Sequence, residues 1–90
     1  MTLKERLLQK IKDTSNIRFF EGFDDAIIGY GIQEHRFIYS LKKCTEILME
    51  RNNENDFDKS YFKVIMAVYE QFKEQDNLMP VFCLDFVVDE

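Results

Sequence analysis

The feature that most restricts the fold is the apolar pattern of residues 57–75, the longest stretch with helical periodicity. At about 100° per residue, the apolar side chains form two adjacent stripes that together cover about 200° of a helix. The core stripe, which we expect to face the interior, contains Phe57, Tyr61, Val64, Ile65, Val68 and Phe72. The second stripe contains Phe62, Met66 and Tyr69. One face of a sheet covers about half of this arc, so the second stripe needs other cover.

Two kinds of cover satisfy the second stripe. Either another helix of the same chain packs on it, or it meets a protein partner or a second copy of the chain. The pattern leaves both alternatives open. We expect at least one of Phe62, Met66 and Tyr69 to stay accessible and to take part in association.

Two shorter amphipathic helices precede the long one. They are predicted over residues 3–13 and 41–51, with Thr2 and Ser40 as N-caps, because Leu, Ile and Cys side chains recur there at helical spacing. Thr2 is followed three residues later by Glu5, the spacing of a capping box. An aspartate at position 56 or 58 is expected to cap the long helix.

Three strands are expected between and after these helices. Apolar residues at positions 26, 28, 30 and 32 alternate as on one face of a strand, which puts Ile27, Gly29 and Gly31 on the other face. Residues 36–40 form a second strand and a hairpin with the first. The alternating segment after Pro80 predicts a third strand.

These elements predict one α+β domain over residues 1–90, in the order helix, strand, strand, helix, helix, strand. We expect a three-stranded, mainly antiparallel sheet covered by helices on one face.

Composition narrows the range of partners. The net charge is −5, and residues 46–90 hold eleven acidic against four basic side chains. A nucleic acid or an anionic membrane as ligand requires a basic surface, so neither is expected.

The sequence lacks an apolar run of membrane-spanning length and an apolar leader, and Cys44 and Cys83 form no disulfide framework. We therefore expect a cytoplasmic protein.

No residue pattern predicts catalysis or a cofactor. Asp24 and Asp25 precede a strand, where they could bind a divalent cation or act as a general base. Other acidic residues and the single histidine do not stand at a recognised ligand spacing, and turn formation explains the pair more simply. Cys44 shares a helical stripe with apolar residues and is expected to be buried, whereas Cys83 is expected to point away from the core.

Several blocks of the sequence resemble a family of short uncharacterised proteins from bacteriophages and bacterial genomes. The blocks are GFDDAIIGYG at residues 22–31, EILMER at 46–51, the Tyr61-Phe62 pair, and Pro80-Val81-Phe82. The family tends to have an asparagine and a small residue where this chain has Ile65 and Met66. The resemblance implies a phage or prophage origin and a host bacterial cytoplasm as the location. It implies no activity.

Three functions follow from these observations. The first is a non-enzymatic, phage-type accessory protein that binds and modulates a host or phage protein, with Phe62, Met66, Tyr69, Asp24 and Asp25 as candidate contact residues. The second is an acidic DNA mimic that inhibits a nucleic-acid-binding enzyme. The third is a small metal-dependent hydrolase or nuclease that uses Asp24 and Asp25. The wide apolar arc and the missing catalytic pattern favour the first.

Overall fold

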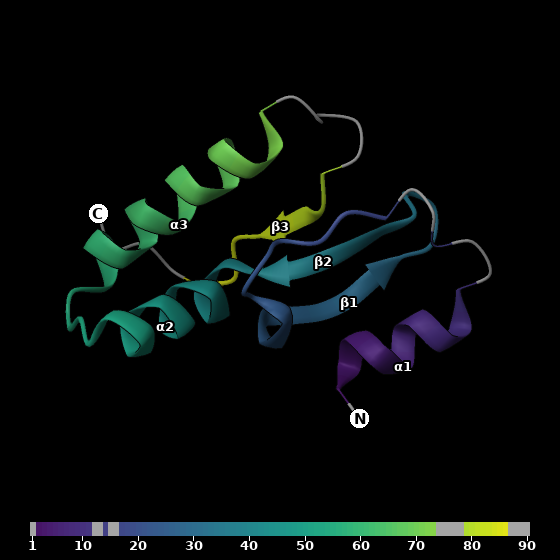
Figure 1. Ribbon diagram of the computed structural model, residues 1–90, viewed down its shortest axis with the longest axis horizontal. Coiled ribbons are helices and arrows are strands. Elements are labelled where there is room, and N and C mark those ends of the chain that lie inside the picture. Colours follow the sequence, from purple (N-terminus) through teal and green to yellow (C-terminus); the bar gives the residue numbers. More distant parts are fainter. Residues whose placement is uncertain (1, 12–13, 15–16, 74–78, 87–90) are drawn as a thin grey trace.

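The computed structural model describes residues 2–11, 14, 17–73 and 79–86, and it confirms the α+β class (Figure 1). Its elements, in chain order, are α1 (Leu3–Lys10), the 3-10 turn η1 (Asp24–Ala26), β1 (Ile27–Gly31), β2 (Arg36–Ser40), α2 (Leu41–Asn52), α3 (Phe57–Phe72) and β3 (Val81–Cys83). The predicted order of helices and strands is therefore the observed one. The predicted end of the first helix, residues 12–13, and that of the long helix, residues 74–75, lie outside the described residues.

The sheet has the order β1-β2-β3 and is mixed rather than mainly antiparallel. β1 and β2 form the predicted antiparallel hairpin, but β3 lies parallel to β2, with Val81 opposite Ile38 and Cys83 opposite Ser40. The path of the chain explains the direction. α2 continues onward from the end of β2 and α3 returns, so the chain re-enters the sheet near the start of β2, as Figure 1 shows. Such a crossover connection produces a parallel pair.

A β-bulge changes which residues of β1 face the core. The register shifts between Ile27 and Gly29, so the alternation predicted from positions 26, 28, 30 and 32 is broken. Ile27 is buried and pairs with Tyr39, whereas Ile28 is 40% exposed. The prediction had placed Ile27 and Tyr30 on different faces, whereas in the structure both pack on the core. Ile32 lies beyond the strand, in the hairpin turn, and is exposed.

The helix starts agree with the predicted caps. The hydroxyl of Thr2 accepts a hydrogen bond from the N–H of Glu5, and that of Ser40 accepts one from Lys43. Asp56, one of the two aspartates proposed for this role, caps α3 by accepting the N–H of Lys59. Each cap satisfies a backbone donor that the first turn of a helix leaves unpaired.

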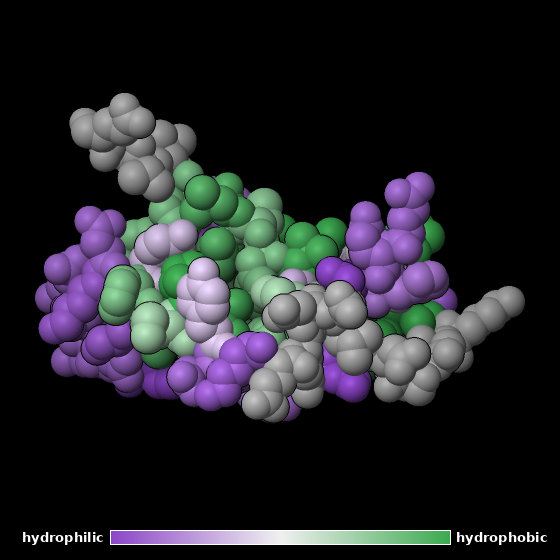
Figure 2. Space-filling view, turned by 90° about the horizontal axis from the view of Figure 1, so that it is seen from above, coloured by the Kyte–Doolittle hydropathy of each residue, from purple (hydrophilic) through white to green (hydrophobic). Residues whose placement is uncertain are grey.

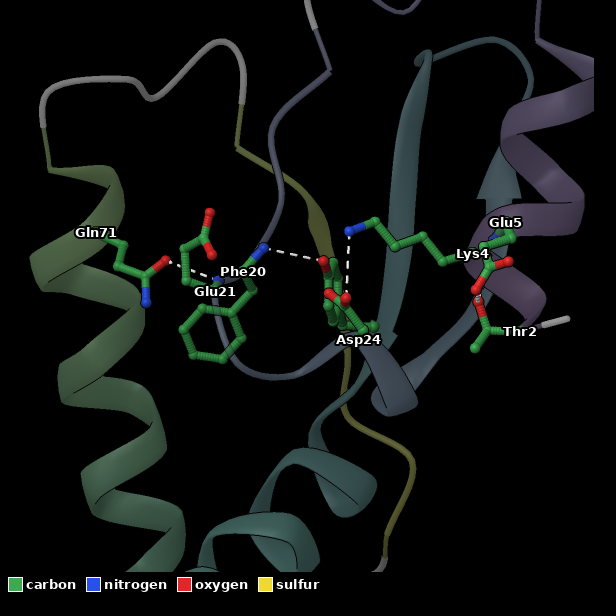
Figure 3. Close-up of polar contacts among 8 residues, drawn as sticks. Thr2, Lys4, Glu5, Phe20, Glu21, Asp24 and Gln71 are labelled. Carbon is green, nitrogen blue, oxygen red and sulfur yellow. Dashed lines mark hydrogen bonds and ion pairs between the residues drawn. The ribbon is translucent and has the colours of Figure 1, made fainter.

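The core face of the sheet is covered by segment 17–23, which ends in a turn at residues 21–22, as well as by helices. Phe20 is fully buried and stacks on Phe23 at 4.3 Å between ring centroids. Its ring also meets Tyr39 of β2 and Phe82 of β3 edge-on. The backbone N–H of the next residue, Glu21, donates to the side-chain oxygen of Gln71 on α3 (Figure 3). This segment joins the sheet to α3, a core role that was not predicted for it.

α2 and α3 form an antiparallel pair at one end of the sheet, and α1 lies beside β1 at the other (Figure 1). On α3, Val64, Phe72 and Ser60 are buried, and Tyr61 and Val68 are partly buried against the core. The predicted core stripe therefore faces inward as expected.

Candidate protein-binding surface

The second stripe of α3 is exposed along its whole length. Phe62, Met66 and Tyr69 are 65%, 48% and 68% exposed, so the alternative in which another helix covers them is wrong for the described residues. α2 packs against the other side of α3, and α1 lies at the far end of the sheet (Figure 1). Figure 2, which views the molecule from the α3 side, shows apolar and weakly polar surface between strongly hydrophilic groups. A contiguous apolar patch on a small domain is typical of an interaction surface.

An apolar groove of about 290 Å³ adjoins the second stripe. It is lined by Leu41, Ile65, Val68, Tyr69, Phe72, Lys73, Met79 and Phe82. Tyr69 belongs to both features, so the groove and the stripe form one continuous surface. Sequence reasoning missed the groove because α2, α3 and β3 all contribute to its walls. Lys73, just after α3, and Met79, just before β3, are its wall residues in the described part of the connection between these elements.

The charged residues around the second stripe have both signs. Lys59 lies 3.4 Å from a carboxylate oxygen of Glu54, and Lys73 lies 3.6 Å from one of Glu70. Lys63, one turn after Lys59 on α3, is also exposed. Exposed pairs such as these contribute little to stability, but their arrangement can select a partner and its orientation.

Asp24 and Asp25 lie in η1, as the turn interpretation predicted. The Asp24 carboxylate accepts a hydrogen bond from the ammonium group of Lys4 at 3.2 Å (Figure 3). The same ammonium lies 4.1 Å from the centre of the Phe19 ring. Asp24 therefore helps to attach α1 to the rest of the domain.

The single histidine and other acidic residues that could add ligands to this pair are dispersed. Glu34 and His35 lie in the turn between β1 and β2, where the Tyr30 hydroxyl is 3.3 Å from Nδ1 of His35. Asp85 lies at the start of α2, where its carboxylate accepts hydrogen bonds from the Ser40 hydroxyl and the Lys42 N–H. Within the described parts of the chain, no three His, Cys, Asp or Glu residues are grouped as a metal site would require.

Cys44, Tyr39, Asp85 and Glu54 have shifted pKa values, and each shift has a structural cause. Hydrogen bonds from the backbone N–H groups of Asp56 and Asn55, together with the nearby Lys59, lower the pKa of Glu54. Burial raises the pKa of Cys44 and of Tyr39 to about 12. Desolvation also raises the pKa of Asp85, but its hydrogen bonds from Ser40 and Lys42 outweigh this effect and hold the pKa below its ordinary value. Cys44 is fully buried, as predicted, and Cys83 is half-buried. The charge of Asp85 adds to the rise in the Cys44 pKa, and Cys44 adds to that in the Tyr39 pKa, both as smaller effects than burial.

A scan against protein-family models, a search of curated proteins and a search of solved structures each return no match to this chain. Of the helices that the structure describes, none combines the length and the apolar character needed to cross a lipid bilayer.

Proposed function

We propose that this protein is a non-enzymatic binding protein that docks onto another protein through the second stripe of α3 and the adjoining apolar groove. One observation carries the proposal: Phe62, Met66 and Tyr69 are aligned and exposed on a helix whose other side is packed. Aromatic and methionine side chains are enriched at the centres of protein interfaces, where they contribute most of the binding energy.

The charge pattern supports a protein as the partner. The chain has a net charge of −5, and two of the lysines that border the second stripe, Lys59 and Lys73, are already paired with glutamates. A phosphate backbone would meet repulsion from the chain as a whole and little unpaired basic charge at the stripe. An apolar protein surface with a mixed polar rim fits this border better.

The resemblance of residues 22–31 and 46–51 to phage proteins indicates where the partner belongs. A small phage-type accessory protein acts in a bacterial host, so the partner is a host or phage protein. Asp24 is engaged by Lys4, and we therefore place the contact on α3 rather than on the aspartate pair.

Affinity capture tests the proposal. Tagged wild-type protein and a Phe62→Ser variant are incubated with bacterial lysate, and Ile32→Ser serves as the matched control because Ile32 is 80% exposed in the hairpin turn. We expect a captured protein that is retained by Ile32→Ser and lost by Phe62→Ser. Equal capture by all three chains would refute the proposed surface.

Ionic strength separates this proposal from a DNA mimic. A contact centred on aromatic side chains should change little between about 0.05 and 0.5 M salt, because screening acts on charges. A steep loss of the captured protein over this range would instead support an acidic mimic.

A further inference from the structure

We infer that the second stripe is covered by a second copy of this chain, with the two α3 helices antiparallel and Phe62 of each copy inserted in the apolar groove of the other. This inference rests on the proposed function, because it names an occupant for the same surface. It is carried by the positions of Phe62, Tyr69 and the groove on α3.

The helix geometry makes the surface self-complementary. At about 100° per residue, Phe62 and Tyr69 lie within about 20° of each other, and both are offset from Met66 toward the same side. At about 1.5 Å per residue they are about 10 Å apart along the axis. A two-fold axis between Ile65 and Met66 therefore brings each Phe62 level with Tyr69 of the second copy.

The groove lies on the side to which Phe62 is offset. Ile65, Tyr69 and Phe72 line it, and all three follow the same flank of α3. A two-fold axis perpendicular to antiparallel helices places equivalent flanks opposite each other, so Phe62 of one copy faces the groove of its neighbour. The groove volume of about 290 Å³ is sufficient for a phenyl ring, since an apolar cavity of about 150 Å³ can hold benzene.

Charges at the border match in this arrangement. The same two-fold axis sets Lys63 on the same flank as Glu70 of the second copy, about 3 Å away along the helix axis, and these two charges are opposite. Lys73 of the second copy lies between Asp58 and Lys59, so it meets one charge of each sign. In a parallel arrangement the two flanks exchange sides and Lys63 loses its opposite charge, so the antiparallel arrangement is favoured.

The available area indicates a weak dimer. Phe62 and Tyr69 expose 65% and 68% of their surface, and an aromatic side chain offers about 150–250 Å², so two copies contribute about 500 Å² from these residues. Met66, the groove walls and the lysine stems bring the total near the lower end of the range for specific interfaces, about 1,200 Å². Such a dimer exchanges readily, so a protein partner that uses the same stripe can displace the second copy.

Molar mass measured by light scattering over a concentration series tests the dimer. We expect the wild type to rise from 10.8 kDa toward twice that mass, with a midpoint at about 10–100 μM. Phe62→Ser should weaken association at least about tenfold, and Ile32→Ser should leave it unchanged. A wild-type mass that stays at 10.8 kDa up to about 1 mM would overturn the inference.

A charge exchange tests the antiparallel register. Lys63→Glu alone should weaken the dimer, and adding Glu70→Lys should restore it, because each helix then again offers opposite charges to the other. Failure of the second change to restore association would reject this register.

The position of Phe62 has its own reporter, since the chain contains no tryptophan. In a Phe62→Trp variant, the emission should shift to the blue as the concentration passes the association midpoint, because the indole enters the groove. Ile32→Trp should show no shift. Unchanged emission from position 62 while the mass doubles would show that the dimer uses another face.

The two proposals fail separately. A monomeric wild type whose captured partner is lost in Phe62→Ser would reject the dimer and retain the binding surface. A Phe62→Ser variant that both dimerises and captures protein like the wild type would reject both.

Discussion

The hydroxyl oxygen of Tyr39 accepts a hydrogen bond from the backbone N–H of Phe20 at 2.9 Å. Both residues are fully buried, Tyr39 in the central strand and Phe20 in segment 17–23. The bond satisfies a backbone donor that packing alone would leave without a partner in the core. It therefore holds the segment on the sheet, where Phe20 also contacts Phe72 of α3, the helix that carries the binding surface.

Removing this acceptor should be costly. We expect Tyr39→Phe to lower the free energy of unfolding by about 1–3 kcal/mol, because the Phe20 N–H stays buried without an acceptor. Urea denaturation measures the change. Tyr30→Phe is the matched control: its hydroxyl makes an exposed 3.3 Å contact with His35, and the expected loss is about 0.5 kcal/mol or less. Equal losses in the two variants would contradict the assigned role.

Alkaline pH should destabilise the fold through buried groups. Burial raises the pKa of Tyr39 from 10.0 and that of Cys44 from 9.0, each to about 12. The native state thus keeps protons that the unfolded chain has lost. The resulting stability is complete below about pH 9 and is lost as the pH rises toward 12. Denaturation curves over this range should show a falling free energy of unfolding, less steep in Tyr39→Phe. A constant value up to about pH 11 would contradict the burial of both groups.

Acidic pH should act through Asp85. In the folded protein the pKa of Asp85 lies below its ordinary value of 3.8, so its charged carboxylate stabilises the fold. This stabilisation is present above pH 3.8 and is lost as the pH falls through the pKa of the folded state. We expect Asp85→Asn to cost about 1 kcal/mol at neutral pH, as the loss of a helix cap does. The difference from the wild type should shrink in acid, while the exposed Asp25→Asn serves as the control. A difference that persists unchanged at about pH 2 would argue against an ionic role.

Thiol labelling should distinguish the two cysteines. Cys44 is fully buried and burial raises its pKa to about 12, so a thiol reagent should modify it much more slowly in the native protein than in denaturant. Cys83 is half-buried and should react first. Mass spectrometry after proteolysis assigns the label to each residue. Rapid native labelling of Cys44 would show that α2 is rotated or opens readily.

Local sequence signals predicted the local structure. Thr2, Ser40 and Asp56 act as N-caps because a side-chain oxygen at that position satisfies the first helical N–H groups whatever the surroundings. The helical spacing of Val64 and Phe72 likewise indicated the inward face of α3.

Features that depend on distant contacts were not predictable in this way. The bulge after Ile27 brings Ile27 and Tyr30 to the core side together, which breaks the alternation that their spacing predicts. The parallel pairing of Val81 with Ile38 depends on the path of two intervening helices. The apolar groove joins Phe82 to Tyr69, so it exists only in the folded chain. The width of the apolar arc on α3 indicated that one sheet face could not cover the second stripe. It did not indicate that α2 would pack on the other side of α3 and leave this stripe exposed.

The most direct test of the binding surface is the association affinity of Tyr69→Ser, measured by light scattering on samples whose unfolding free energy is determined in parallel. Tyr69 is 68% exposed, so we expect the unfolding free energy to change by about 0.5 kcal/mol or less, while association weakens at least about tenfold. A loss of about 3–5 kcal/mol of stability with association unchanged would show that Tyr69 is a core residue, and would contradict the account.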